Sequence, residues 1–427
     1  MSTRRRFMGL SLGLGAATVL RGVHAEAETG PQEALPASIA ALRPMREQAK
    51  PITLDERKQR MARAMELMAK NKMDAIVLCG GTSTVYFTAV RWWVSERFFA
   101  IVIPAKGSPI CVCPSFEADR AGEQLKTCPL SGVEMVTWVE DQDPYGMMGQ
   151  ALRSRGLTSA TIGVEERVQF AFSDGMAKAM PQYRFVSATP ITAGCRMIKS
   201  AHELQLMTIA NHATLAVYEA VYKALRPGMT QNQASALIDK AYEKVGFRGE
   251  ASVQVGEFSA LPHGSMTPQV IGEGQIVMID DGCTVEGYQS DITRTFVLGK
   301  ATDKMKNVFD IVHRAQKAAL EAARPGVLCE AVDAAARKVV EDGGYGPDYK
   351  FFGHRVGHGI GMDGHEWPYL VRGNKMPLAA GMCFSDEPGV YIPHEFGVRL
   401  EDDMHITENG AELFTPQSPS LEEPFGK

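Results

Sequence analysis

The sequence QIVMIDDGCTVEGYQSDITRT, residues 275–295, decides the character of the domain around it. Its apolar run, 276–279, ends in the carboxylate of Asp280, and a turn through Gly287 leads to a second run that begins near Asp291. This pattern predicts two strands joined by a turn. Such strands can place the two carboxylates side by side, where their charges repel each other unless a cation lies between them.

More acidic and histidine side chains follow within 125 residues. His354, His358 and His365 are three of the ten histidines, and SDEPG (385–389) and RLEDD (399–403) each end a strand-like run in acid. Each feature alone is typical of a turn, a solvated surface or a packed core. Together they indicate a metal site, because buried carboxylates without a matching lysine cluster need a cation. Oxygen and imidazole ligands without thiolate favour manganese, cobalt, iron or zinc.

The chain also contains an internal repeat. The segment ALRPG (224–228) is matched by AARPG (322–326) at an offset of 98 residues. The same register aligns further identical residues: Ala236 with Ala334, Lys240 with Lys338, Glu243 with Glu341 and Gly246 with Gly344. The offset is too long for a solenoid. It predicts two related halves about a pseudo-twofold axis, each a helix pair followed by strands, and an interface between such halves is a natural place for a site.

Residues 53–194 have a different pattern, in which short apolar runs alternate with helical segments. Strands are predicted at 74–79, 98–103, 110–113, 161–165 and 183–186, with helices at 117–126 and 172–180. Thr53 and Glu56 fit a capping box that begins an earlier helix. The alternation predicts an α/β domain with a mainly parallel sheet. Trp92 and Trp93 are adjacent, so on a strand only one would face the core, and we expect the other to meet another surface.

Residues 1–25 are typical of a cleaved export signal. Arg4-Arg5-Arg6 precedes an uncharged run of 14 residues, Phe7–Leu20, which is shorter than the roughly 20 residues of a membrane span and suits a signal peptide. The arginines ahead of this run resemble the twin-arginine signal of bacteria. A general secretory signal and a chance basic start are the alternatives. We expect a periplasmic or secreted protein with no membrane span after signal removal, and a linker over 26–52.

The composition excludes several classes of protein. Of 427 residues, 45% are hydrophobic and 22% are charged, as in ordinary globular proteins. Lys and Arg total 45 against 50 Asp and Glu, without long blocks of like charge, so nothing indicates nucleic acid as a partner. Eight cysteines are too few for a disulfide scaffold. Most lie in apolar runs, so free thiols are favoured over a bridge between Cys111 and Cys113.

The motifs of residues 263–403 resemble those of the creatinase, prolidase and aminopeptidase P family of pita-bread metallopeptidases, and the resemblance extends from about residue 55 to the C-terminus. The family's five metal ligands match Asp280 and Asp291 in IDDGCTVEGYQSDITRT, His358 in HRVGHGIG, Glu387 in SDEPGVYI and Glu401 in VRLEDD. The family's substrate histidines match His263 in LPHG, His354 in HRVGHGIG and His365 in DGHEWP.

The resemblance implies an α/β N-terminal domain over 53–194 and an α+β pita-bread catalytic domain, with a pseudo-twofold internal repeat, over 195–427. It also implies a homodimer, in which the segment Arg91-Trp92-Trp93 would reach the active-site mouth of the partner. The partner molecule at the active site would be a small peptide. The bond cut would be the X-Pro bond of a dipeptide or a short peptide.

The resemblance further implies two divalent metal ions per chain, with manganese first and cobalt, zinc or iron as alternatives, and a metal-bridging hydroxide as the nucleophile. Asp291 and Glu401 would bridge the ions, Asp280 would complete one site, and His358 with Glu387 would complete the other. Glu387 would also carry the proton to the leaving nitrogen. His263 and His365 would stabilise the oxyanion and the substrate carbonyl, His354 would line the pocket for the second residue, and Arg399 would orient Glu401 or an anionic substrate end.

Asp281 departs from the family pattern, in which a small or apolar residue is usual at this position. It keeps a non-peptidase member of the fold open as an alternative, either a C–N hydrolase or an enzyme like dimethylsulfoniopropionate lyase. The five matched ligands argue against a metal-free creatine hydrolase and against a non-enzymatic binding protein. Both a dipeptidase and an aminopeptidase are compatible with the motifs.

Overall fold

The computed structural model describes residues 34–426, so the predicted export signal at 1–25 lies outside the described residues. Among residues 34–426, no helix is both long enough and apolar enough to cross a bilayer. All eight cysteines lie in this part of the chain as buried free thiols. This agrees with the prediction against a bridge between Cys111 and Cys113.

The N-terminal domain is built on a six-stranded sheet with the order β4-β3-β2-β1-β5-β6. Its strands are β1 Ala75–Cys79, β2 Ala100–Pro104, β3 Ile110–Pro114, β4 Glu134–Trp138, β5 Thr161–Val164 and β6 Arg184–Ser187. β2 is antiparallel to both of its neighbours, and the other pairs are parallel. Only residues 105–109 join β2 to β3, too few for a crossover helix. The mainly parallel sheet is confirmed, with β2 as its reversed strand.

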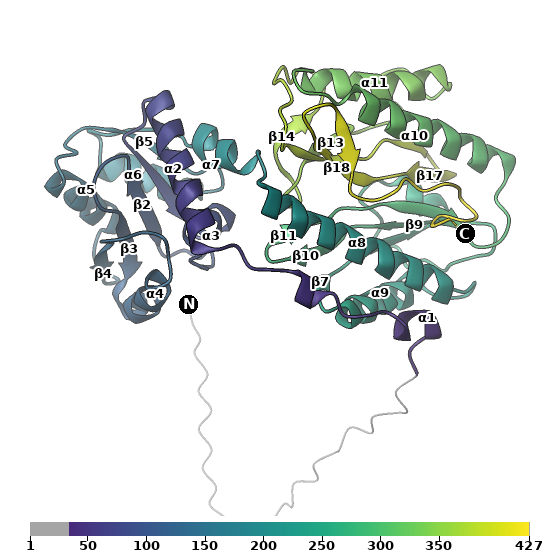
Figure 1. The fold of residues 1–427 in the computed structure, drawn as a ribbon, viewed down its shortest axis with the longest axis horizontal. Helices are drawn as coiled ribbons and strands as arrows, with labels where there is room; N and C mark the ends of the chain where they lie inside the picture. The colour runs from purple at the N-terminus through teal and green to yellow at the C-terminus, as the bar shows by residue number, and fades with distance from the viewer. Residues whose placement is uncertain (1–33, 427) are drawn as a thin grey trace, which may run out of the picture. The chain divides into compact units, whose positions relative to one another are not determined.

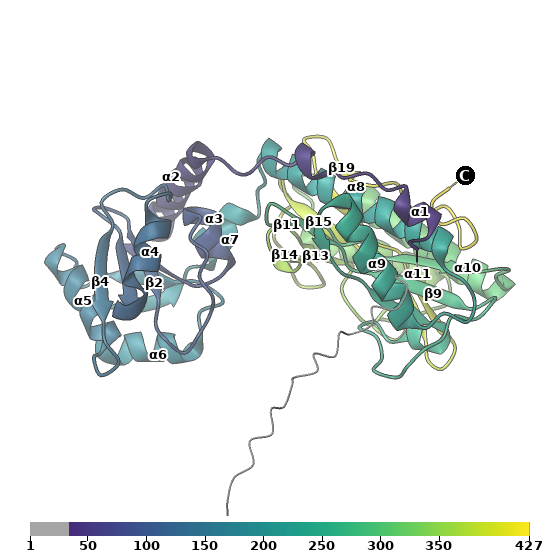
Figure 2. The same cartoon turned by 90° about the horizontal axis from the view of Figure 1, so that it is seen from below.

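Helices cover both faces of this sheet (Figures 1 and 2). They are α2 Leu54–Asn71, α3 Thr82–Thr88, α4 Ala118–Leu125, α5 Pro144–Ser154, α6 Phe170–Ala179 and α7 Thr189–Arg196. Adjacent strand residues serve opposite faces, since Ile76 packs with α2 and α7 whereas Val77 packs with α5 and α6. The predicted capping box begins α2, where Thr53 Oγ1 accepts from the Glu56 N–H at 3.3 Å and Glu56 Oε2 accepts from the Thr53 N–H at 2.8 Å.

Trp92 and Trp93 lie in the irregular segment between α3 and β2 and not on a strand. Trp92 is buried and stacks on Phe99, with ring centroids 4.1 Å apart. Trp93 stacks on Trp92 at 5.5 Å and is 48% exposed. One tryptophan of the pair thus belongs to the core and the other faces outward, although strand alternation is not the reason.

The catalytic domain consists of two halves that each begin with a helix pair. The pairs are α8 Ala201–Ala224 with α9 Gln231–Val245, and α10 Asp303–Ala322 with α11 Cys329–Asp342. The repeated sequence forms the same turn in both halves, where Gly228 (φ +92°) and Gly326 (φ +85°) adopt the left-handed conformation that glycine tolerates. The Gly228 N–H donates to Ile271 O and the Gly326 N–H donates to Leu378 O, both at 2.8 Å. The internal repeat is therefore confirmed.

Strands lie between the two helix pairs of this domain (Figure 1). The first half has β7 Arg248–Gly249, β8 Ser252–Val255, β9 Ile276–Asp280, β10 Cys283–Val285, β11 Tyr288–Gln289 and β12 Arg294–Val297. The second half has β13 Gly357–Gly359, β14 Glu366–Leu370, β15 Cys383–Asp386, β16 Gly389–Ile392, β17 Phe396–Arg399, β18 Asp402–Ile406 and β19 Ala411–Leu413. α8 and α9 share one apolar core with β8–β10, and α10 and α11 share another with β15–β18. This is the predicted α+β pita-bread arrangement.

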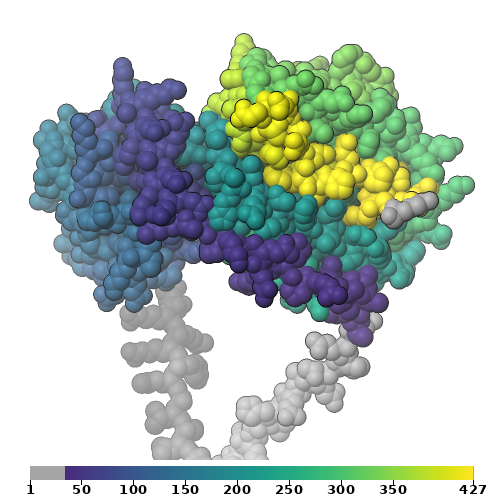
Figure 3. All heavy atoms as spheres, in the orientation of Figure 1, coloured from purple at the N-terminus to yellow at the C-terminus, as the bar shows by residue number. Residues whose placement is uncertain are grey.

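Residues 34–52 differ from the free linker expected over 26–52. A short helix, α1 Ala37–Ala40, places Ile39 in the apolar core of α8 and α9. Ser38 Oγ donates to Ala220 O at 2.7 Å, and the Met45 N–H donates to Val245 O at 2.8 Å. Figures 1 and 3 show this segment lying along the catalytic domain before the chain enters α2. The expected boundary between 194 and 195 also falls inside α7, which ends at Arg196.

Candidate metal centre

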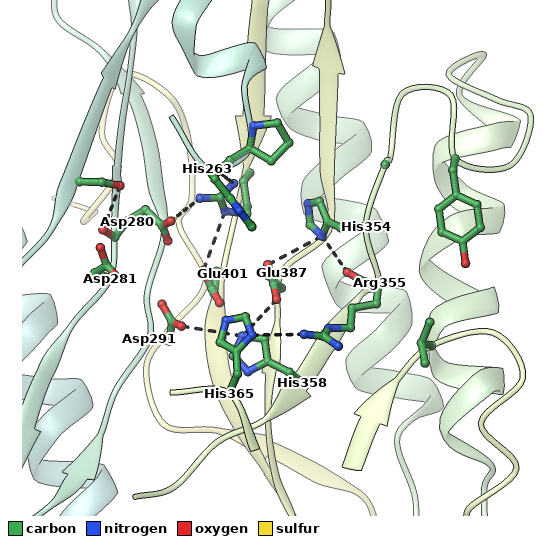
Figure 4. Close-up of a pocket in the computed structure, with 16 residues that line it drawn as sticks. His263, Asp280, Asp281, Asp291, His354, Arg355, His358, His365, Glu387 and Glu401 are labelled. Carbon is green, nitrogen blue, oxygen red and sulfur yellow. Dashed lines mark hydrogen bonds and ion pairs between the residues drawn. The ribbon is translucent and has the colours of Figure 1, made fainter. Parts of the chain in front are cut away.

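One cavity of about 690 Å³ in the catalytic domain is lined by all nine residues that the sequence predicted for the site (Figure 4). The predicted metal ligands among them are Asp280, Asp291, His358, Glu387 and Glu401. The predicted substrate-side residues are His263, His354, His365 and Arg399. The structure therefore brings the whole predicted set together, from positions as far apart in sequence as 263 and 401.

The ligand side chains come from both halves of the domain. Asp280 ends β9, and Asp291 lies just before β12, which pairs with β9 in an antiparallel register that sets Arg294 opposite Ile279. In the second half, His358 lies in β13, Glu387 follows β15, and Glu401 directly precedes β18. Most of these carboxylates lie at or next to a strand end. The apolar run that forms each strand therefore determines the position of its carboxylate. In Figure 4 their side chains point toward a common centre.

The ligand atoms form three overlapping groups, each with its members within 4.8 Å of one another. One group is Asp280, Asp291 and Glu401, and a second is His358, Glu387 and Glu401. A third group joins Asp291 and His358 to His365. The first two groups contain the five predicted ligands and share Glu401, so the arrangement offers two adjacent positions for a cation.

The electrostatics of the cavity suit a divalent cation. Burial, and then the charges of neighbouring carboxylates, raises the pKa of Asp291 and Glu401 well above the ordinary range. Burial also raises the pKa of Glu387, to about 7. Carboxylates held so close together without enough positive charge are the environment that a bound cation relieves. The donors are carboxylate oxygens and imidazole nitrogen without thiolate, which fits manganese, cobalt, iron or zinc.

His358 is held in the form that binds metals. Burial, followed by the neighbouring His365, lowers the pKa of His358 to about 3, so its imidazole is neutral at neutral pH. Its Nδ1 lies 3.2 Å from Gly359 O, while Nε2 lies 3.3 Å from Glu387 Oε1 and 3.8 Å from Asp291 Oδ2. A hydrogen bond from Nδ1 to the backbone leaves Nε2 as the nitrogen that faces the ligand groups.

Arg399 is engaged with protein groups around the ligands. It forms an ion pair with Asp280, and its Nε donates to Thr293 Oγ1 at 2.9 Å. Its Nη1 donates to Pro262 O and to the hydroxyl of Tyr391, at 3.1 and 2.9 Å. Most of its N–H groups are thus used within the protein, which favours orientation of the ligands over capture of a substrate carboxylate.

Two residues of the site lay outside the predicted set. Thr293 Oγ1 lies 2.5 Å from Asp280 Oδ1 and 2.6 Å from Glu401 Oε2, so it connects the two carboxylates. The Tyr391 hydroxyl lies 2.7 Å from His354 Nε2 and also accepts from Arg399. Both lie within the quoted motifs, Thr293 in the SDITRT segment and Tyr391 in SDEPGVYI, but only the fold shows what they contact.

Comparison with known proteins identifies the two domains. Metallopeptidase family M24 matches residues 205–408, and the creatinase/prolidase N-terminal domain matches residues 60–198. The probable dipeptidase PepE of Mycobacterium tuberculosis (strain ATCC 25618 / H37Rv) is 36% identical over 357 residues, which cover 83% of this chain and 92% of that protein. The Xaa-Pro dipeptidase of Lactobacillus delbrueckii subsp. lactis is 31% identical over 362 residues, covering 83% of this chain and 96% of that one.

A solved structure agrees with these sequence matches. The crystal structure of dipeptidase PepE from Mycobacterium ulcerans superposes with a TM-score of 0.80 and 34% identity, covering 87% of this chain and 99% of that chain. The likeness therefore extends over both domains and not over the catalytic motifs alone. The protein belongs to metallopeptidase family M24, with a creatinase/prolidase N-terminal domain ahead of its catalytic domain.

Proposed function

We propose that the protein hydrolyses the bond before proline in X-Pro dipeptides or short X-Pro peptides with the help of two divalent metal ions, manganese before cobalt, zinc or iron. The observation that carries this proposal is the pair of three-residue groups that share Glu401, because it offers two adjacent cation positions with a common carboxylate. The relatives named probable dipeptidase and Xaa-Pro dipeptidase support a small peptide as the substrate.

In this proposal Asp291 and Glu401 would hold both ions, Asp280 would complete one position, and His358 with Glu387 would complete the other. Two bound ions acidify a water molecule and so supply the nucleophile at neutral pH. Glu387 would accept a proton from the attacking water and return it to the proline nitrogen as the bond breaks. The tertiary amide of an X-Pro bond has no N–H, so the strand-like recognition that ordinary proteases use fails at this bond.

The substrate-side residues orient the peptide. His263 and His365 donate to the substrate carbonyl and to the oxyanion that develops from it. His354 lines the pocket for the proline ring, and its contact with the Tyr391 hydroxyl at 2.7 Å fixes the orientation of its imidazole. Arg399 holds Asp280, through the ion pair described above, and lies 4.0 Å from Glu401 Oε2, so it orients ligands of both positions.

The test is hydrolysis of an X-Pro dipeptide beside an X-Pro-Y tripeptide and an X-Leu dipeptide. We expect chelation to remove activity, and added manganese or cobalt to restore it for at least one of the X-Pro peptides and not for X-Leu. Cleavage of the dipeptide alone would define a dipeptidase, and cleavage of the tripeptide an aminopeptidase. Turnover of creatine or dimethylsulfoniopropionate without turnover of either X-Pro peptide would instead establish the non-peptidase alternative.

We also propose that the protein is exported in the folded state to the periplasm or beyond, since the paired arginines ahead of the run Phe7–Leu20 support the twin-arginine route. Replacing Arg4, Arg5 and Arg6 together with lysine should leave the precursor inside the cell, because any two adjacent arginines of the three can serve as the pair. Fractionation followed by immunoblotting measures this. Normal export of the triple variant would point to the general secretory route.

We propose a homodimer in which Trp93 reaches the active-site mouth of the partner subunit. Its 48% exposure beside the buried Trp92 supports this. Trp92→Ala should cost about 3–5 kcal/mol of folding free energy, because it leaves a cavity in the core. Trp93→Ala should cost far less and instead change KM or the preference for peptide length. Denaturant unfolding and peptide kinetics separate the two variants, and a monomer in light scattering would exclude the proposal.

A further inference from the structure

The segment of residues 361–365 carries His365 into the cavity without secondary structure of its own. It joins β13 to β14 and contains Gly361 and Gly364, which add backbone freedom. The exposed ring of His365 stacks on that of His358, with centroids 3.7 Å apart and planes 20° apart (Figure 4). From the catalytic domain, Arg355 Nη2 lies 3.2 Å from His365 Nδ1 and the Gln289 N–H donates to Gly361 O at 2.8 Å.

Charged residues of the N-terminal domain hold this segment. Asp363 Oδ1 accepts from Thr82 Oγ1 at 2.6 Å and lies 3.2 Å from Arg167 Nη1, while Oδ2 pairs with Arg196. The same Arg196 Nη2 also pairs with Glu366, the first residue of β14. Arg167 Nη2 donates to the backbone carbonyl of His365 at 3.1 Å. The N-terminal domain thus contacts the segment at Asp363, at the carbonyl of His365 and at the adjoining Glu366.

The central part of this network is buried. Arg196, Asp363 and Glu366 are each at most 9% exposed, and Lys199, which follows α7, adds a second buried cation 2.7 Å from Glu366 Oε1. Two cations therefore face two carboxylates away from water. Charge-assisted hydrogen bonds in such surroundings are short and directional, so they fix the geometry of the groups they join.

We propose that the N-terminal domain positions His365 within its own subunit, with Arg167 and Arg196 as positioning residues for the segment 361–365. The proposal rests on the proposed function only for the role of His365 in turnover. A displacement of about 1 Å at a group that contacts the substrate can cost up to about 100-fold in rate. The N-terminal domain thereby acts on catalysis in cis, separately from any contact with a partner subunit.

The first test measures amide hydrogen exchange on the metal-free protein. Arg167→Gln is the main variant, because the side chain is 57% exposed and its loss leaves Asp363 still paired with Arg196. Arg196→Gln is the stronger variant if it folds. Arg60→Gln is the matched control, since buried Arg60 also joins the two domains, through Glu203 at 3.0 Å and the Tyr288 hydroxyl at 2.7 Å, without touching the segment.

We expect faster exchange of residues 361–366 in Arg167→Gln than in the wild-type chain, and no change there in Arg60→Gln. Equal exchange of this segment in the wild type and Arg167→Gln would overturn the proposal. Acceleration of the same size in the control would do so as well, because it would show general loosening between the domains. Neither result depends on metal or on turnover.

The second test is a double-mutant cycle with His365→Ala. Arg167→Gln should lower kcat by about 10- to 100-fold with little change in KM, and it should add nothing further in the His365→Ala background. Additive effects in the double variant would overturn positioning through His365. Full turnover by His365→Ala would refute the proposed role of His365 in catalysis. A wild-type protein that is inactive on X-Pro peptides would refute the proposed function. In either case the hydrogen-exchange test would still decide whether Arg167 positions the segment 361–365.

Discussion

Asp291→Ala and His358→Ala are expected to lose turnover almost completely while the protein keeps its fold. Each removes a ligand atom from two of the three groups in the cavity. A bound metal ion would supply several kcal/mol of transition-state stabilisation, and about 1.4 kcal/mol corresponds to a tenfold change in rate. We therefore expect kcat/KM to fall by at least about 1,000-fold, with fewer than two metal ions bound per chain by elemental analysis.

The stability of the metal-free proteins provides a second, independent test of the Asp291→Ala prediction. A carboxyl group whose folded-state pKa lies above its unfolded value opposes folding at any pH above the unfolded value. Burial and the neighbouring carboxylates raise the pKa of Asp291 in this way. The metal-free Asp291→Ala protein should thus unfold at an equal or higher denaturant concentration than the metal-free wild type at pH 7.

Asp281→Asn is the matched control for Asp291→Ala, because Asp281 lines the same cavity but belongs to none of the three ligand groups. It should bind as many metal ions per chain as the wild-type protein does. Two ions per chain and full turnover in Asp291→Ala would show that the ligand assignment is wrong. Loss of metal from the Asp281 variant as well would mean that total negative charge, and not ligand identity, retains the ions.

Arg294→Met should lower the stability of the fold by as much as the core variant Trp92→Ala. Arg294 and Asp402 are 1% and 0% exposed, with Arg294 Nη2 2.6 Å from Asp402 Oδ1. Arg294 Nη1 also donates to Glu401 O at 2.9 Å. Removing one partner of a buried ion pair leaves an uncompensated charge and costs about 3–5 kcal/mol, which the midpoint of urea unfolding of the metal-free protein measures.

Two further variants make the Arg294 experiment decisive. Lys338→Met removes an exposed partner of Asp342, 2.8 Å away on α11, and should change stability by at most about 1 kcal/mol. Arg294→Met with Asp402→Leu removes both charges and should recover part of the loss. If Arg294→Met unfolds at the same urea concentration as Lys338→Met, the buried pair does not stabilise this fold.

The convergence of the five proposed ligands on one cavity could be predicted from the sequence, because each of these residues lies in a short motif at or near the end of an apolar run. In such a motif the strand and the position of the carboxylate are both local properties. The two helix pairs could also be predicted from the sequence, since ALRPG and AARPG form the same glycine turn in each half. Contacts between residues far apart in the sequence could not be predicted in this way. The bond from Arg399 to Tyr391, and the approach of Arg167 and Arg196 to residues 361–366, depend on the completed fold.

Helix α3 of the N-terminal domain shows a second reason why some elements could not be predicted from the sequence. α3 has the sequence TSTVYFT, rich in residue types that favour strands. Its last turn is nevertheless helical, and Arg57 donates to Val85 O and Tyr86 O at 2.6 and 3.1 Å from the neighbouring helix α2. Hydrogen bonds from another helix to the free carbonyls at the helix end stabilise the helix despite the strand propensity of its residues. The segment 34–52 is a second example, because its composition is typical of linkers although the side chain of Ile39 is fully buried.

The division of the ligands between the two halves has a consequence for how the protein unfolds. Asp280 and Asp291 belong to the first half, and His358, Glu387 and Glu401 to the second, so neither half holds a complete pair of cation positions. An ion held by Asp280, Asp291 and Glu401, the group that needs both halves, would add about 2.7 kcal/mol at a concentration 100 times its Kd. Because the two helix pairs pack in separate apolar cores, we expect calorimetry to show broad, weakly cooperative melting without metal and a single sharp transition with it.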